Sequence, residues 1–159
     1  MLDVGCYDGA LFARYADRIA YGVGLDPQLA ASGQRGKFRF HADGFPSAAV
    51  AEERFDVITF LAVLEHVDVA TLGTWHEACD QLLATGGTIV ATVPSPRVDD
   101  ILHALIKLRL IGGMSVHQHH GFDPRQVPAA FAGASLSLVE RRRFELGLNN
   151  LYVFKKTGE

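Results

Sequence analysis

The stretch Asp3-Val4-Gly5-Cys6-Tyr7-Asp8-Gly9 decides the fold of this chain. A short apolar run ends in an acid, two glycines follow four residues apart, and a helical pattern covers residues 10–20. This order predicts a strand, a tight turn and the N-terminus of a helix. Glycines let a ligand approach the backbone closely, and a helix N-terminus offers unpaired N–H donors. The stretch therefore predicts a ligand-binding turn, of a kind that many nucleotide-binding proteins share.

Three further blocks end predicted strands in polar residues. They are Gly22-Val23-Gly24-Leu25-Asp26, His41-Ala42-Asp43-Gly44, and residues 55–67 with the element Leu64-Glu65-His66. Open α/β folds bind ligands at the carboxyl ends of their strands. Taken in order, the four blocks resemble the class I S-adenosylmethionine-dependent methyltransferases, especially the small-molecule branch (methyltransferase type 11/12-like). The resemblance covers nearly the whole chain.

Composition agrees with one globular domain over residues 1–159. Hydrophobic residues make up 48% of the chain and charged residues 21%, which excludes a disordered chain. The net charge of −3 gives no electrostatic footprint for nucleic acid or an anionic membrane, and no apolar run is long enough to span one. Cys6 and Cys79 cannot form a disulfide framework, so we expect reduced thiols and a cytoplasmic protein.

Alternating strands and helices predict a mostly parallel sheet with helices on both faces, a Rossmann-like three-layer α/β sandwich. We expect strands near 1–5, 21–26, 37–42, 55–61 and 87–93, and helices near 9–19, 28–33, 46–53, 70–84 and 98–110. A short helix at 124–132 precedes strands at 135–144 and 151–156, whose short connection makes them an antiparallel C-terminal hairpin. The resemblance implies seven strands in the order 3-2-1-4-5-7-6.

The resemblance also implies S-adenosylmethionine as cofactor and S-adenosylhomocysteine as product. Asp3 with Gly5 would hold the methionine end, Asp26 the ribose diol, and Asp43 the adenine amino group. The other expected cofactor-binding residues lie beside these: Cys6, Tyr7, Gly9, Pro27, Gly44, Phe45 and Leu61. Each acid has a plainer alternative, since Asp3 could brace the turn, Asp26 could form an Asp-Pro turn, and Asp43 could cap a helix.

Two aromatic residues of this set leave alternatives open. Phe45 precedes Pro46 and suits a buried core better than a stack on adenine. Tyr7 stands where the family often has a third glycine. Because Tyr7 carries a Cβ, either the loop shifts or the ring covers the methionine tail.

Histidines supply the candidate catalytic bases. His66 and His120 could each remove a proton from an acceptor hydroxyl, because an imidazole titrates near neutral pH. For His66 a structural role in its loop is the alternative. The run His117-Gln118-His119-His120 has no partner ligands at a recognisable spacing, so we expect no metal. The apolar segment 98–111 could be a lid, a dimer contact or a buried helix.

The expected activity is methyl transfer to a small-molecule acceptor, with an oxygen, nitrogen or carbon acceptor atom left open. One alternative is a non-catalytic module that binds the cofactor or a partner protein. An NAD-dependent oxidoreductase is less favoured, because the turn lacks the full G-x-G-x-x-G pattern and the chain leaves no room for a substrate domain. We expect the N-terminal helix common in the family to be absent, since Met1 adjoins the first strand. An exposed apolar face near Leu11 and Phe12 would then favour a homodimer.

Overall fold

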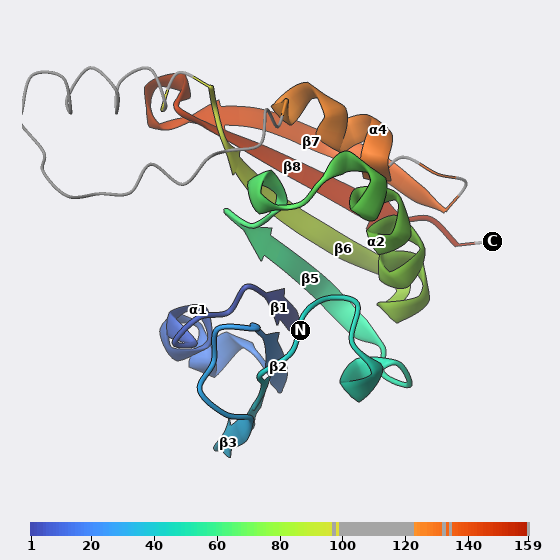
Figure 1. The fold of residues 1–159 in the computed structure, drawn as a ribbon. Coiled ribbons are helices and arrows are strands. Elements are labelled where there is room, and N and C mark those ends of the chain that lie inside the picture. Colours follow the sequence, from blue (N-terminus) through green and yellow to red (C-terminus); the bar gives the residue numbers. More distant parts are fainter. Residues whose placement is uncertain (97, 99–122, 132, 134, 159) are drawn as a thin grey trace, which may run out of the picture.

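The computed structural model describes residues 1–96, 98, 123–131, 133 and 135–158. Its centre is an eight-stranded sheet in the order β3-β4-β2-β1-β5-β6-β8-β7 (Figure 1). The strands are β1 (Leu2–Val4), β2 (Gly22–Leu25), β3 (Gly33–Arg35), β4 (Phe38–His41), β5 (Phe55–Leu61), β6 (Leu83–Pro94), β7 (Leu136–Phe144) and β8 (Asn149–Lys156). With β3 set aside, the other seven strands have the predicted order 3-2-1-4-5-7-6, so this order is confirmed. Strand β3 is an eighth strand that was not predicted.

Strand direction changes only toward the two edges of this sheet. The strands β4, β2, β1, β5 and β6 run parallel, so their carboxyl ends meet at one edge. Strand β8 is antiparallel to both β6 and β7, as predicted for the C-terminal hairpin. Strand β3 adds an antiparallel partner to β4 at the other side.

Helices cover both faces of the sheet. They are α1 (Ala10–Arg14), α2 (Val69–Leu82) and α4 (Val127–Phe131), with short 3₁₀ segments η1 (Ala16–Arg18), η2 (Ala48–Val50), η3 (Leu64–His66), η4 (Pro124–Gln126) and η5 (Glu145–Gly147). The crossover through α1 leads from β1 to β2, and the crossover through α2 leads from β5 to β6 in the opposite direction along the sheet. Because such crossovers are right-handed, α1 and α2 lie on opposite faces.

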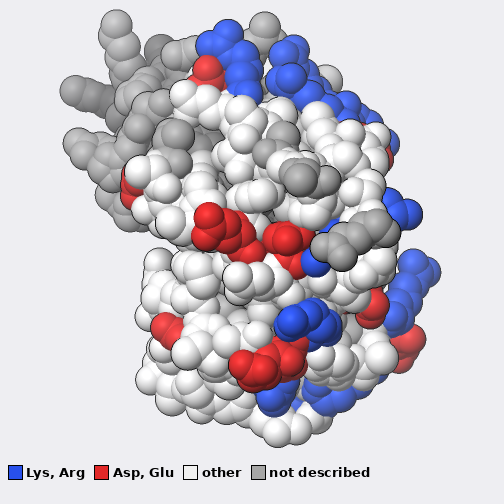
Figure 2. All heavy atoms as spheres, turned by 90° about the vertical axis from the view of Figure 1, so that its right-hand side faces the viewer, with Lys and Arg blue, Asp and Glu red and all other residues white. Residues whose placement is uncertain are grey.

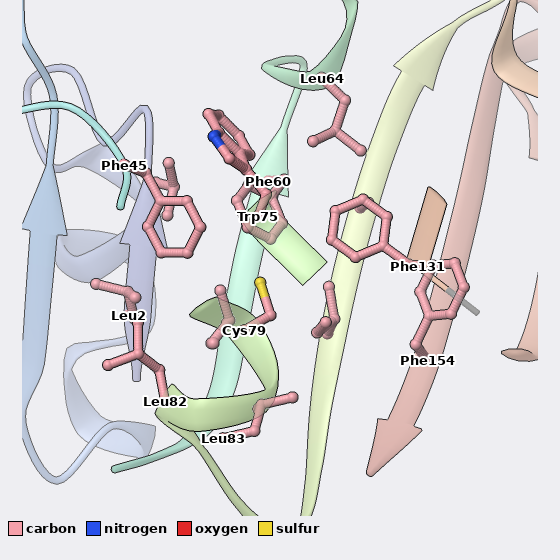
Figure 3. Close-up of a cluster of buried hydrophobic side chains, with 14 of the residues drawn as sticks. Leu2, Phe45, Phe60, Leu64, Trp75, Cys79, Leu82, Leu83, Phe131 and Phe154 are labelled. Carbon is pink, nitrogen blue, oxygen red and sulfur yellow. The ribbon is translucent and has the colours of Figure 1, made fainter. Parts of the chain in front are cut away.

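The face under α2 and α4 carries the main core (Figure 3). Phe60 of β5 stacks on Trp75 of α2 with ring centroids 5.5 Å apart, and Phe45 meets both rings edge-on. Phe131 of α4 joins Phe60 to Phe154 of β8. This aromatic series ties the N-terminal strands to the C-terminal hairpin.

The face under α1 carries a second, smaller set of buried side chains, which we call the small cluster: Cys6, Phe12 and Phe40. Phe12 stacks on the half-buried Phe38 with centroids 4.9 Å apart. Glycine at positions 22 and 24 of β2 leaves the space, because an added Cβ would meet Phe12 and Cys6 at 2.5 and 2.6 Å. The expectation of an exposed apolar face at Phe12 is wrong, because its side chain is buried in this cluster.

The helix predicted at 28–33 is also wrong. Asp26 accepts the backbone N–H of Gln28 at 2.8 Å and its carbonyl accepts that of Leu29, which closes a turn instead. The chain then forms β3 at Gly33–Arg35 and turns through Gly36 at φ 58° into β4. Here the Asp-Pro turn and the two glycines outweigh the short apolar pattern.

Other boundaries differ from the prediction by a few residues. The predicted helix 9–19 divides into α1 and η1, and 46–53 holds only the 3₁₀ turn η2. Helix α2 ends at Leu82, because Leu83 already pairs with Phe55 and begins β6. Strand β6 continues to Pro94, and β8 begins at Asn149 rather than 151. The predicted helix 98–110 lies outside the described residues, save for residue 98.

Strand β7 forms an exposed edge of the sheet, and only its first residue, Leu136, is buried. It contains three consecutive exposed arginines, Arg141, Arg142 and Arg143. Figure 2 shows Lys and Arg side chains gathered at the upper end of the molecule, the end that carries β7 and β8 in Figure 1. Charged side chains on an edge strand discourage pairing with another sheet. Among the described residues, the helices are too short and too polar to cross a membrane.

Candidate active site

The carboxyl ends of β1, β2, β4 and β5 bring together most of the residues predicted to bind the cofactor. Asp3 lies in β1, Asp26 follows β2, Asp43 follows β4, and Leu61 ends β5. The register of the parallel strands pairs Asp3 with Thr59 of β5 and Val4 with Leu25 of β2. The turn after β1 therefore lies beside the ends of β2 and β5.

Two glycines of the turn are required by its conformation and its packing. Gly5 has φ 76°, its N–H donates to the carbonyl of Leu25 at 2.8 Å, and an added Cβ would lie 2.4 Å from Cγ2 of Val63. Gly9, at φ 81°, lies against the ring of Phe40, which an added Cβ would meet at 2.7 Å. The glycines thus let the turn pack closely on the loop after β5 and on the small cluster.

Asp3 is a buried carboxylate, and the Thr59 hydroxyl donates a hydrogen bond to its Oδ1 at 2.6 Å. Burial raises the pKa of Asp3 to about 6, the Thr59 hydrogen bond opposes this rise, and the nearby negative charge of Asp26 adds to it. A carboxylate whose ionised form is destabilised in this way is stabilised by a neighbouring cation. The site therefore suits an ammonium group.

Asp26 is also buried, and both of its oxygens accept backbone N–H groups. Oδ2 accepts from Tyr7 and Oδ1 from Gln28, each at 2.8 Å. The carboxylate thus joins the turn after β1 to the turn after β2, with the exposed Pro27 between. Because each carboxylate oxygen can accept more than one hydrogen bond, acceptor capacity remains for a ligand hydroxyl. The structural role of Asp26 is therefore compatible with the ligand-binding role that the sequence predicts.

Tyr7 and Cys6 differ sharply in exposure. Tyr7 adopts φ 45°, the left-handed region that a glycine would occupy without strain, and its side chain is 71% exposed. The loop therefore keeps its shape despite the missing third glycine. Cys6 is buried in the small cluster, and burial raises the pKa of its thiol to about 12, so the thiol stays protonated.

Asp43 lies exposed at the end of β4. Its Oδ1 accepts the N–H of the half-buried Gly44 at 2.8 Å, and its Oδ2 accepts the Ser47 hydroxyl at 2.6 Å. These two hydrogen bonds lower the pKa of Asp43, so it is ionised at neutral pH. The Phe45 ring lies in the main core between Phe60 and Trp75, so stacking of this ring on adenine is excluded and only its backbone adjoins the edge.

The loop after β5 holds the predicted base His66. Leu61 is 36% exposed, and the N–H of Ala62 donates to the carbonyl of Thr92 in β6. Segment η3 follows, with Glu65 buried and His66 exposed. His120 and the remaining histidines of residues 117–120 lie outside the described residues. Within the part of the chain that is described, no three His, Cys, Asp or Glu side chains gather in a way that could hold a metal ion.

Three residues near this edge were not predicted from the sequence. Thr59 binds Asp3, Val63 packs on Gly5, and Arg35 donates to the carbonyl of Asp8 at 2.8 Å. A lone threonine in the apolar run of β5 was a usable signal, because a buried hydroxyl needs a partner. No comparable sequence signal indicated Arg35, because its contact with Asp8 depends on strand β3, which was not predicted.

Comparison with known proteins adds a family and a fold. A family model described as a methyltransferase domain matches residues 1–140. Comparison with curated protein sequences gave no match. Among solved structures, the N-methyltransferase NodS from Bradyrhizobium japonicum WM9 is similar, with 19% identity, a TM-score of 0.68, and coverage of 99% of this chain and 85% of that chain.

Two other similar structures come from different organisms. CalS10, an amino pentose methyltransferase from Micromonospora echinaspora solved with bound S-adenosylmethionine, has 21% identity, a TM-score of 0.68, and coverage of 98% of this chain and 82% of that chain. The PH0226 protein from Pyrococcus horikoshii OT3 has 12% identity, a TM-score of 0.71, and the same two coverages. At such identities the likeness establishes the fold.

The family match covers most of the chain, and the strand order is the one expected of that family. The buried Asp3 carboxylate beside the turn at residues 5–9 is chemically suited to a positively charged group. This chain belongs to the methyltransferase-domain family and is a class I S-adenosylmethionine-dependent methyltransferase.

Proposed function

We propose that this enzyme transfers the methyl group of S-adenosylmethionine to a small-molecule acceptor, and that the cofactor lies across the carboxyl ends of β1, β2 and β4. The observation that carries the placement is the pair of buried carboxylates, Asp3 and Asp26, beside the turn at residues 5–9. Asp3 binds the ammonium of the methionine end. Asp26 accepts the ribose hydroxyls with the lone pairs that its two backbone N–H donors leave free.

Asp43 and its neighbours supply the adenine end. The ionised Asp43 is exposed at the end of β4, where its carboxylate accepts the adenine amino group. The backbone of Gly44 and Phe45 borders the ring edge. Leu61 and the loop after it line the side that faces the acceptor. The remaining turn residues, Cys6 and Gly9, act through the backbone and the packing beneath it.

In the cofactor the methyl group is bonded to a positively charged sulfur, which activates it for transfer. The protein then needs to align the acceptor atom with the methyl carbon and to exclude water. An oxygen acceptor must also lose a proton, which the exposed His66 of η3 accepts. His120 is the second candidate for this role.

The cofactor placement is tested by combining a protein variant with a ligand variant. Calorimetry compares S-adenosylhomocysteine with its 2′-deoxy analogue on the wild type and on Asp26→Ala. We expect Asp26→Ala to weaken binding of the natural ligand by about 1.5–3 kcal/mol, and the missing hydroxyl to cost much less in this variant than in the wild type. An equal cost in both proteins would remove Asp26 from the ribose site and leave it as a support of the turn.

The acceptor and the base are tested by measuring methyl-transfer kinetics with a panel of small compounds that offer a hydroxyl group, an amine or a nucleophilic carbon atom. With a hydroxyl acceptor, His66→Ala should lower kcat by about 10²–10⁴ and leave cofactor affinity unchanged. The wild-type rate should fall as the pH drops below the imidazole pKa. A raised KM with an unchanged pH profile would instead assign His66 to acceptor positioning.

A further inference from the structure

Tyr7 keeps a backbone conformation that its own side chain disfavours. At φ 45°, it is one of four non-glycine residues with positive φ in the part of the chain that the structure describes. A residue with a Cβ is strained in this region, whereas glycine is not. The side chain is 71% exposed, so burial in the core does not offset this strain. Strained residues that packing does not explain occur at functional sites.

The backbone of Tyr7 is hydrogen-bonded to one buried carboxylate and lies in the turn that follows the other. Its N–H donates to Oδ2 of Asp26, and its chain neighbours lead back through Gly5 to Asp3. The two carboxylates are close enough that Asp26 helps to raise the pKa of Asp3. In the proposed site these carboxylates bind the ribose and the ammonium of the cofactor. The sulfonium lies between those two ends of the molecule, so in the proposed site it lies beside the turn that contains Tyr7.

We propose that Tyr7 is a positioning residue whose ring covers the sulfonium of the bound cofactor and favours the charged S-adenosylmethionine over the neutral S-adenosylhomocysteine. This inference rests on the proposed cofactor placement. The face of an aromatic ring attracts a cation, and the attraction disappears when the sulfur loses its charge. The ring also excludes water from one side of the methyl group. Because the side chain is exposed and not packed into the core, the ring can turn onto the ligand.

The proposal predicts a difference between substrate and product binding. Because the attraction depends on charge, its loss weakens S-adenosylmethionine more than S-adenosylhomocysteine. The ring thus helps the product to leave after the methyl group has been transferred. A tyrosine that only shaped the turn would affect both ligands equally.

The experiment measures the affinities of both ligands by calorimetry for the wild type, Tyr7→Leu and Tyr7→Phe. Leucine keeps the Cβ, so the backbone strain is the same, but it removes the ring. We expect Tyr7→Leu to weaken S-adenosylmethionine about three- to tenfold and S-adenosylhomocysteine less than about twofold. Tyr7→Phe should retain the wild-type ratio of the two affinities. Equal losses for both ligands in Tyr7→Leu would overturn the proposal.

Tyr15→Leu is the matched control, because Tyr15 is 40% exposed and lies at the end of α1, away from the turn. It should leave both affinities unchanged. Thermal unfolding without ligand checks that Tyr7→Leu folds as well as the wild type. If Asp26→Ala weakens both ligands while Tyr7→Leu leaves their ratio unchanged, only the role of Tyr7 is refuted. If neither variant affects binding, the proposed cofactor placement itself is wrong.

Discussion

The two faces of the sheet are packed with very different amounts of apolar side chain. The main core, under α2 and α4, runs from β1 to β8 and contains most of the buried aromatic residues. The small cluster of Cys6, Phe12 and Phe40 lies under α1 and directly supports the turn at residues 5–9. The fold therefore depends mainly on one face, and the turn at residues 5–9, where we propose that the cofactor binds, depends on the other. Substitutions on the two faces should separate stability from cofactor affinity.

The largest expected effect comes from truncating a ring in the main core. Phe60→Ala removes a fully buried side chain that contacts Trp75, Phe45 and Phe131, and should lower the free energy of unfolding by about 3–5 kcal/mol. Urea denaturation measures this change. The same truncation in the small cluster, Phe40→Ala, should cost less stability and also weaken S-adenosylhomocysteine. A larger stability loss in Phe40→Ala with unchanged affinity would contradict the division between the two faces.

The ionised Asp3 carboxylate should lower the free energy of unfolding when no ligand is bound. A pKa raised from 3.8 to about 6 corresponds to about 3 kcal/mol of lost stability at neutral pH. The unfolded carboxyl ionises near pH 3.8 and the folded one only near 6, so the penalty is absent below the first value, grows between the two and is complete above the second. Asp3→Asn keeps an oxygen for the Thr59 hydroxyl and should remove the penalty.

The measurement is the difference in unfolding free energy between Asp3→Asn and the wild type as a function of pH. We expect the variant to be more stable by about 3 kcal/mol above pH 6, with the difference vanishing below pH 4, and to bind S-adenosylhomocysteine poorly. Asp56→Asn is the control, because Asp56 is exposed on β5 and should change stability by less than about 0.5 kcal/mol. A difference that does not vary with pH would show that Asp3 is not titrating in this range.

Sequence patterns predicted the fold well because the deciding signals are local. The acid-ended strands, the glycine turn and the short link before β8 each require only neighbouring residues. The prediction of a helix at 28–33 was wrong because the few apolar residues there compete with a turn that the side chain of Asp26 closes. The ends of α2 and β6 shifted because pairing between Phe55 and Leu83, far apart in sequence, fixes them.

The site was predictable to the extent that it depends on single strand ends. Asp3, Asp26 and Asp43 reach one edge because parallel strands share their direction. Their partners were not predictable in the same way. Thr59 meets Asp3 through the register of β1 with β5, and Arg35 reaches Asp8 from a strand that the sequence did not indicate. The burial that raises the pKa of Asp3 is a tertiary property as well.

A smaller effect is expected where the two faces meet at the turn. Gly5→Ala must hold φ 76° and displace Val63, so it should lower the free energy of unfolding by more than about 1–2 kcal/mol, the cost of the left-handed backbone alone. Gly73→Ala lies in α2 with open space around it and should stabilise the protein by about 0.5–1 kcal/mol. Thermal unfolding compares the two. A Gly5→Ala protein as stable as the wild type would show that Val63 and the turn can move apart freely.

Substitution of Arg35 in β3 is expected to have the smallest effect on stability and a clear effect on cofactor affinity. Its guanidinium lies 4.1 Å from the centroid of the Phe40 ring and donates to the carbonyl of Asp8 at 2.8 Å, so it supports the turn from the edge strand of the sheet. Arg35 is exposed, and Arg35→Ala should therefore cost only about 0.5–1 kcal/mol of stability. Because the carbonyl of Asp8 loses the donor that holds it in place, the turn becomes less rigid. Affinity for S-adenosylhomocysteine should therefore fall about two- to fivefold.

Lys37→Ala is the matched control for Arg35→Ala. Lys37 lies over the ring of Phe38 in the same region and donates to the carbonyl of Ala16, but it has no contact with the turn at residues 5–9 among the described residues. It should show a similar small loss of stability in thermal unfolding and an unchanged affinity in calorimetry. If both variants weaken binding equally, general loosening of the small cluster explains the effect. If only Arg35→Ala does so, the strand β3 contributes to cofactor binding through one side chain.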